Sequence, residues 1–197
     1  MGERVHKSCK RITKIDEISN LKEMLENTKR KYGTENAFIF KTEEKEKFRT
    51  ITYNEYISEI EALGTALINI GLSGKRIAVI SENRYEWTLS YLATVTGVGI
   101  VVPLDKSLPD NELESSIERS EAEAIFYSSK YDEIMKKLKQ KSKNNIKMYI
   151  SMDADKSDGE IYSQKELINE GKELIKNGDI RYKNAKIDNE AMSIMLF

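Results

Sequence analysis

Few side chains in this sequence could do chemistry on their own. The chain has one histidine, His6, and one cysteine, Cys9, and both lie near the N-terminus, where chains are usually poorly ordered. One histidine cannot build a multi-histidine metal centre, and one cysteine can form neither an internal disulfide nor a cysteine-based zinc site. We therefore expect no metal site, and any chemistry would depend on carboxylates, hydroxyls, lysines, arginines or backbone amides.

The common phosphate-binding and nucleophile motifs are missing from the sequence. It contains neither a Gly-x-x-x-x-Gly-Lys-Ser/Thr loop nor a Gly-x-Ser-x-Gly elbow. Gly97–Gly99 begins a dinucleotide fingerprint, but Val102 stands where the third glycine belongs, and the motif precedes an apolar run instead of following one. The residues alone thus assign no catalytic side chain.

One cation stands where a parallel sheet would bind a ligand. Lys106 lies in the turn Leu104–Ser107, directly after the apolar run Gly99–Pro103. Ligands of open α/β sheets bind beyond the carboxyl ends of the strands, and an ammonium group there suits a phosphate. The alternative is an ordinary exposed lysine, as most lysines are.

Alternating strands and helices would have to position such a residue. Continuous apolar runs predict buried strands near residues 76–81, 99–103, 124–127, 147–150 and 192–197. Amphipathic segments between them predict helices. This alternation predicts an α/β fold with a largely parallel sheet flanked by helices.

Local signals place several of these helices. Two earlier strands, 37–40 and 48–52, precede a helix with the capping box Thr52–Glu55. Asn83 is the expected N-cap of a helix that reaches about residue 96. Pro109 is expected in the first turn of the next helix, and Ser163–Glu166 forms a second expected capping box.

We divide the chain into an N-terminal segment, 1–35, with a short amphipathic helix from about residue 18, and a main unit, 36–197. The acidic stretch 151–160 predicts a loop. The apolar stretch 192–197 stops without a turn, cap or polar tail, which favours a chain cut within a longer protein. A cut strand would expose apolar surface, so we also expect self-association.

Composition narrows the range of partners. The 197 residues are 39% hydrophobic and 33% charged, which is compatible with a folded domain. The 32 basic and 33 acidic side chains give a net charge of −1, without the excess positive charge on which nucleic-acid binding usually rests. The longest apolar run, 89–104, is shorter than the roughly 20 residues of a membrane span, and no signal peptide is evident. We expect a cytoplasmic protein with no nucleic-acid partner and no transmembrane segment.

One block of sequence is much more specific. Residues 74–87 read Gly-Lys-Arg-Ile-Ala-Val-Ile-Ser-Glu-Asn-Arg-Tyr-Glu-Trp, and residues 102–105 read Val-Pro-Leu-Asp. The block resembles the N-terminal part of the adenylate-forming, AMP-binding acyl-CoA synthetases. The resemblance extends from about Asn36 to Phe197. These synthetases share a Gly-x-x-Gly-Asp/Lys-Arg-Val-Ala-Ile strand, an Asn-x-x-Glu-Trp helix start and a Gly-Ala-Val-x-Val-Pro-Leu strand. The amino-acid sequence of residues 81–87 looks most like that of the long-chain fatty acid CoA ligases. Val98 replaces the common alanine, and no aspartate follows Gly74.

The resemblance implies the N-terminal subdomain of the acyl-CoA synthetase-like fold. It implies a parent ligase that uses ATP and Mg²⁺ to activate a fatty acid as acyl-AMP and then transfers the acyl group to CoA. The family's phosphate-binding loop would lie after Phe197, so this chain alone is expected to be inactive and to bind no cofactor. In related ligases the turn that matches Leu104–Ser107 lies near the CoA tunnel, which implies a CoA contact for Lys106.

Two other classes of protein stay open at this point. One is a free-standing α/β binding module, such as a receiver-like signalling domain, whose acidic site Glu82 and Asp105 imitate weakly. The other is a non-catalytic interaction protein. Trp87, Tyr85 and Tyr91 could form a substrate wall, but core packing is the preferred reading, with Trp87 mostly buried. Arg84 is expected at the surface or in an ion pair with a nearby carboxylate.

Overall fold

A computed structural model describes residues 17–41, 47–141 and 144–197. His6 and Cys9 lie outside these described residues. The elements, in chain order, are α1 (Leu21–Tyr32), β1 (Asn36–Lys41), β2 (Phe48–Thr52), α2 (Tyr53–Asn69), β3 (Arg76–Ile80), α3 (Tyr85–Ala93), the π-helix η1 (Thr94–Val98), β4 (Ile100–Pro103), α4 (Asp110–Ser120), β5 (Ala124–Tyr127), the 3₁₀ turn η2 (Ser129–Tyr131), α5 (Asp132–Gln140), β6 (Met148–Ser151), β7 (Ile161–Ser163) and α6 (Gln164–Lys176).

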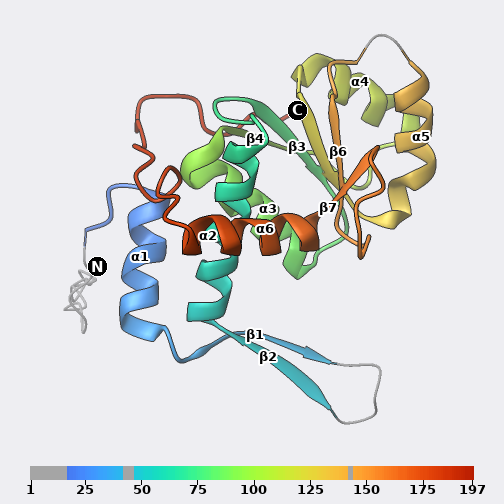
Figure 1. Ribbon diagram of the computed structural model, residues 1–197. Coiled ribbons are helices and arrows are strands. Elements are labelled where there is room, and N and C mark those ends of the chain that lie inside the picture. The colour runs from blue at the N-terminus through green and yellow to red at the C-terminus, as the bar shows by residue number, and fades with distance from the viewer. Residues whose placement is uncertain (1–16, 42–46, 142–143) are drawn as a thin grey trace, which may run out of the picture.

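A five-stranded parallel sheet forms the centre of the fold (Figure 1). Its strand order is β4-β3-β5-β6-β7, and every neighbouring pair is parallel. On β3, between its two neighbours, Ile77 pairs with Val101 of β4 on one side and with Ala124 of β5 on the other. The predicted α/β fold with a largely parallel sheet is confirmed.

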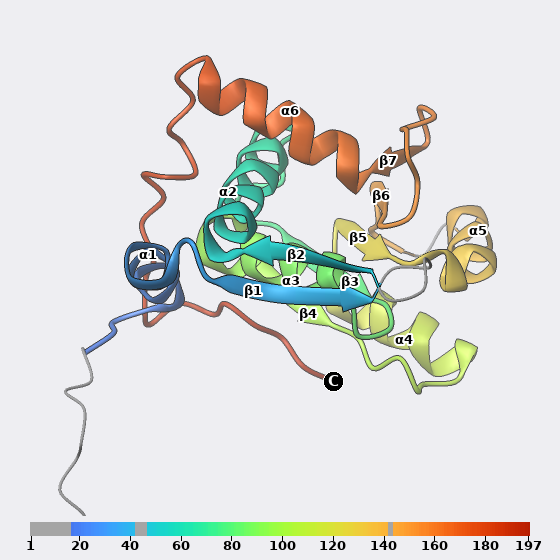
Figure 2. The same cartoon turned by 90° about the horizontal axis from the view of Figure 1, so that it is seen from below.

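Helices cover both faces of the sheet. Along β3, Ile77 and Val79 belong to the core layer under α2, α3 and α6, whereas Ala78 and Ile80 belong to the layer under α4 and α5. Figure 2 shows α2 and α6 on one side of the sheet and α4 on the other. Burial on both faces explains why the strands read as continuous apolar runs.

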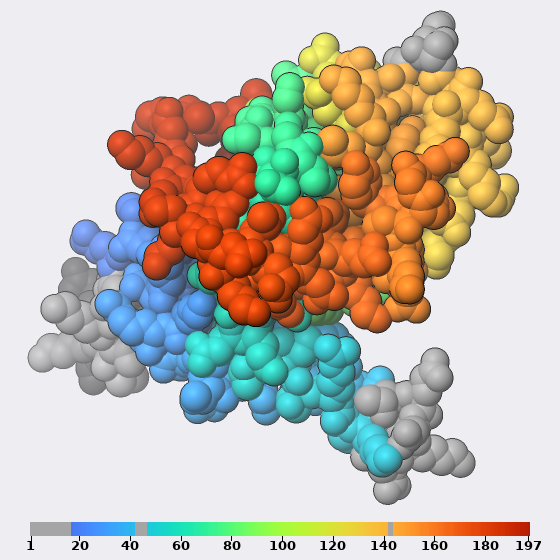
Figure 3. All heavy atoms as spheres, viewed as in Figure 1, coloured from blue at the N-terminus to red at the C-terminus, as the bar shows by residue number. Residues whose placement is uncertain are grey.

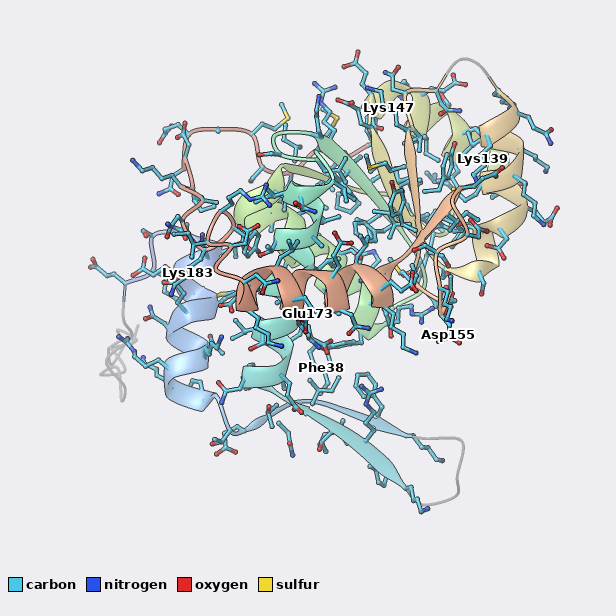
Figure 4. All side chains as sticks on the ribbon, in the orientation of Figure 1. Phe38, Lys139, Lys147, Asp155, Glu173 and Lys183 are labelled. Atoms are coloured by element: carbon cyan, nitrogen blue, oxygen red, sulfur yellow. The ribbon has the colours of Figure 1, made fainter. Side chains whose placement is uncertain are left out.

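The first two strands form a separate antiparallel hairpin beside this sheet. Phe38, near the root of the hairpin (Figure 4), packs edge-on against Tyr56 and Tyr85, with ring centroids 4.9 and 5.1 Å apart. The predicted capping box of α2 is confirmed. The Thr52 hydroxyl accepts from the Glu55 N–H at 3.3 Å, and the Glu55 carboxylate accepts from the Thr52 N–H at 2.7 Å.

The helix predicted from Asn83 to about residue 96 differs at both ends. It begins at Tyr85 after Arg84, which makes no side-chain capping bond. Asn83 does not cap it, because its amide oxygen accepts from the Lys106 ammonium group at 3.1 Å. At the other end α3 widens into the π-helix η1, where Gly97 leaves helical geometry with a φ of 159°.

Three other local predictions need correction. A strand, β7, follows the acidic loop and pairs with β6, although no strand was predicted there. The capping box of α6 is only half formed. Ser163 accepts from the Glu166 N–H at 3.2 Å, but the Glu166 carboxylate accepts from the Ser157 N–H, because the acidic loop folds back over the helix start. Pro109 takes the N-cap position of α4 instead of its first turn.

The strand predicted for 192–197 is wrong in extent. Only Ile194 forms a bridge to the sheet, parallel to Val101. The Val101 N–H donates to Ser193 O and the Met195 N–H donates to Val101 O, both at 3.0 Å. A continuous ladder does not form, and Leu196 is 74% exposed.

Candidate ligand site at the carboxyl edge

The carboxyl ends of four parallel strands meet at one edge of the sheet. The loops that leave β3, β4, β5 and β6 there are residues 81–84, 104–107, 128–131 and 152–154, which we call the carboxyl edge. Since β3 lies between β4 and β5, the chain passes from β3 to one side and then crosses to the other. Open α/β sheets bind ligands in the crevice at such a reversal.

A hydrogen bond spans this reversal. The Ser128 hydroxyl, after β5, donates to the Glu82 carboxylate, after β3, at 2.8 Å. The backbone N–H of Glu82 and the Ser128 hydroxyl lower the pKa of the Glu82 carboxyl below its usual value. The loops after β3 and β5 are therefore joined by an ionised carboxylate at neutral pH.

Arg84 joins the loops after β3 and β6. Its Nε donates to Glu86 at 2.7 Å, its Nη1 donates to Asp153 at 2.7 Å, and Glu82 lies 3.7 Å from the same nitrogen. The other oxygen of Asp153 accepts from the Ser129 N–H at 2.7 Å. Burial opposes ionisation of Asp153, but the Ser129 N–H and the Arg84 guanidinium hold its pKa below the usual range. The expected ion pair of Arg84 is confirmed.

Lys106 lies at the same edge, in the loop after β4. Its side chain is exposed, and its Nζ donates to Asn83 Oδ1 at 3.1 Å. Within the described ranges it forms no ion pair with a carboxylate closer than 4.0 Å. The structure thus places Lys106 next to the loop after β3, with an ammonium group that could meet an anionic ligand.

Asp105 and Glu82 do not form a receiver-like acidic site. The Asp105 carboxylate accepts from the backbone N–H and the hydroxyl of Ser107 at 2.8 and 2.7 Å, so it closes its own turn. Glu82 is bonded to Ser128 instead. In the part of the chain that the structure describes, no group of three or more His, Cys, Asp or Glu side chains could hold a metal ion.

A cleft opens beside the carboxyl edge, between the hairpin and the start of α3. Its volume is about 360 Å³, and Asn83 and Arg84 form one wall. Phe40 and Arg49 of the hairpin form the other. Because Asn83 also holds Lys106, the cleft and the Lys106 turn are connected through one side chain.

Trp87 is partly buried and packs against the main core, in agreement with the expectation that it is mostly buried. Its ring stacks on Tyr91 with centroids 5.2 Å apart and planes 15° apart. Because α3 begins at Tyr85, the core face of the helix runs through Tyr85, Leu89 and Ala93. Trp87 therefore lies on the flank of the helix, and Tyr85 is the aromatic side chain that enters the core.

Sequence reasoning missed Ser128 and Asp153 as members of this edge. The available signal was positional: each comes just after a buried strand, as Lys106 does. The strand order, which the sequence did not supply, was needed to bring Asp153 within reach of Arg84.

Comparisons with known proteins agree with this architecture. The family described as AMP-binding enzyme matches residues 25–197. A CoA ligase of Gibberella moniliformis is 30% identical over 93 residues, which cover 47% of this chain and 16% of that protein. Fatty acyl-CoA synthetase A of Dictyostelium discoideum is 31% identical over 84 residues, which cover 42% of this chain and 13% of that protein.

Solved structures share the fold. A long-chain-fatty-acid-CoA ligase from Archaeoglobus fulgidus superposes on 89% of this chain and 33% of its own, with a TM-score of 0.71 and 18% identity. A mutant form of Coronafacic Acid Ligase from Pectobacterium brasiliense gives the same coverage and TM-score at 17% identity. The family match extends over most of the chain, from α1 through all five parallel strands to the last residue. This chain belongs to the AMP-binding enzyme family of adenylate-forming acyl-CoA ligases.

Proposed function

We propose that this chain contributes the N-terminal part of a ligase that activates a fatty acid with ATP and transfers it to CoA. In the first step a carboxylate oxygen would attack the α-phosphorus of ATP, forming acyl-AMP as the bond to pyrophosphate breaks. In the second step the CoA sulfur would attack the acyl carbon, and AMP would leave. The family match over 25–197 is the observation that carries this proposal.

A long-chain fatty acid is the substrate class that we favour. The sequence Ser81–Trp87 supports this class because it resembles that of the long-chain ligases, and one of the structural relatives is a long-chain-fatty-acid-CoA ligase. Thioester formation by the product of the complete reading frame, measured with acids of increasing chain length, tests both the reaction and the class. Thioester formed with long acids is the expected result. No thioester with any carboxylic acid would contradict the reaction.

The chain by itself is expected to catalyse neither step. The Mg²⁺ that the resemblance implies has no cluster of ligands among the described residues. ATP binding would require clustered backbone amides, a lysine or a held metal ion. Isothermal titration of the 197-residue chain should therefore give a Kd for ATP of about 1 mM or weaker, which corresponds to a binding free energy of about −4 kcal/mol at most. Micromolar binding would contradict this.

Lys106 is our candidate for a contact with the phosphates of CoA. It lies at the carboxyl edge and is exposed, and among the described residues its Nζ donates only to the amide oxygen of Asn83. In the complete protein, Lys106→Met should raise the KM for CoA several-fold and leave the KM for ATP unchanged. Lys137→Met, which replaces an exposed lysine of α5, is the matched control. An unchanged KM for CoA would remove Lys106 from the site.

We also propose self-association through residues 192–197. Met192, Ile194 and Leu196 are apolar and are 57, 37 and 74% exposed. A second copy could cover these side chains, because exposed apolar patches favour association. Sedimentation velocity at increasing concentration should show dimers, and Leu196→Lys should suppress them. A monomer at all concentrations would contradict the proposal.

A further inference from the structure

The segment 177–197, which we call the strap, links the end of α6 to the edge of the sheet, and its sequence is mostly polar up to residue 190. It passes α2 and α1 before it reaches β4 (Figures 1 and 2). In Figure 3 the red atoms of the strap lie against the blue atoms of α1. Most of the strap is exposed, but Tyr182 is only 3% exposed. A single aromatic side chain therefore anchors the middle of the strap.

Two glycines make room for the Tyr182 ring. A Cβ at Gly64 of α2 would overlap the ring, and a Cβ at Gly97 of η1 would lie 3.0 Å from it. The ring thus occupies a socket whose walls are the backbones of α2 and the π-helix. Because any larger residue at Gly64 would fill this socket, the fit is specific to a planar ring against glycine.

The Tyr182 hydroxyl forms a hydrogen bond inside this socket, and its donor can be identified. The Tyr182 and Thr96 hydroxyls are 2.6 Å apart, and the Thr96 hydroxyl is also 2.6 Å from Leu92 O. The Leu92 carbonyl can only accept, so it takes the one hydroxyl proton of Thr96. The Tyr182 hydroxyl must then donate to Thr96. Burial raises the pKa of Tyr182 well above its ordinary value, which keeps this donor protonated.

Lys22 of α1 holds the turn that carries Tyr182. Its Nζ donates to the carbonyls of Tyr182, Lys183 and Ala185 at 2.8, 2.9 and 2.9 Å. Figure 4 shows Lys183 beside the upper end of α1. Three carbonyls on one ammonium group use all three of its donors. The turn is therefore fixed from both sides, by α1 and by η1.

We propose that Tyr182 is a positioning residue that sets where residues 193–195 lie along β4. Beyond Tyr182, the strap meets the sheet through one bridge, Ile194 to Val101, and a single bridge is too weak to define a register alone. Since 193–195 run parallel to β4, the strap heads toward the carboxyl edge. The direction of the strap matters for a ligand only if the carboxyl edge binds one, so this part of the inference rests on the proposed function.

Hydrogen exchange at two amides tests this role without any enzyme assay. The Met195 N–H and the Val101 N–H form the bonds between strap and sheet. Tyr182→Phe keeps the ring in its socket but removes the donor. Loss of one hydrogen bond should raise exchange at both amides about fivefold, while the amides of β5 stay unchanged. Thr96→Val should reproduce the effect, and Thr96→Ser, which keeps the hydroxyl, should restore slow exchange.

Tyr162→Phe is the matched control, because Tyr162 is half-buried and its hydroxyl makes no hydrogen bond within the described ranges. Exchange at Met195 in Tyr182→Phe equal to that in the control would overturn the proposal. An equal rise at the amides of β5 would also overturn it, since Tyr182 would then support the whole domain and not the strap. Failure of the ligase assays would leave these exchange results unaffected, so the two proposals fail separately.

Discussion

Replacement of Arg84 by methionine should cost far more stability than a similar replacement on the surface. The Arg84 side chain is 23% exposed, and its partners Glu86 and Asp153 are 33 and 31% exposed. Arg84→Met keeps the aliphatic part of the side chain but leaves two partly buried carboxylates without their cation. Hydrogen bonds to charged groups contribute about 1.5–3 kcal/mol when shielded, so we expect a loss of about 2 kcal/mol.

Lys136→Met is the matched control for distance. Lys136 pairs with Glu133 at 2.8 Å, almost the 2.7 Å of the Arg84 pairs, but these side chains are 68 and 79% exposed. Exposed pairs of this kind contribute little to stability, because water and salt screen them. Urea unfolding followed by circular dichroism, with equal m-values, measures both losses. If the two variants lost equal amounts of unfolding free energy, the argument that burial rather than contact distance determines the contribution of the Arg84 network would be refuted.

Three further outcomes are expected. Desolvation opposes ionisation of Asp153, but the Ser129 N–H and Arg84 lower its pKa, so its stabilisation is present above the unfolded pKa of about 4 and lost as the pH falls further. The stability gap between wild type and Arg84→Met should therefore be full at neutral pH and narrow in urea melts at about pH 3; a constant gap would contradict this. Trp87→Ala should cost about 1–3 kcal/mol and Tyr85→Ala about 3–5 kcal/mol in the same melts, and the reverse order would show that the flank of α3 is covered. Gly171→Ala should destabilise the protein by about 1–3 kcal/mol, because the new Cβ would overlap the backbone oxygen of Ala62, whereas a gain in stability would mean that α6 moves freely.

The sequence predicted what depends on local pattern. Continuous apolar runs identified β3, β4, β5 and β6, because strands buried on both faces leave no polar position. The capping box at Thr52 also followed from spacing alone. The boundary between 1–35 and 36–197 stays a prediction, although α1 is tied to the distant strap through Lys22.

What escaped prediction depends on contacts between distant parts of the chain. Lys106 draws Asn83 away from the cap that its spacing favoured. The strand order brings Asp153 to Arg84, and no local pattern encodes that order. The segment 192–197 has the composition of a strand, yet only one bridge to β4 forms, and Leu196 is 74% exposed. Tyr182 sits in a polar stretch, so its burial could be found only from the glycines of α2 and η1.

The most direct test of the central claim is release of pyrophosphate from ATP that depends on added carboxylic acid. The product of the complete reading frame and the 197-residue chain should be assayed side by side with a long-chain fatty acid and Mg²⁺. The account predicts acid-dependent release by the complete product and none by the 197-residue chain. Absence of acid-dependent release by the complete product would contradict the assignment to ligase chemistry, and release by the 197-residue chain would contradict its expected inactivity.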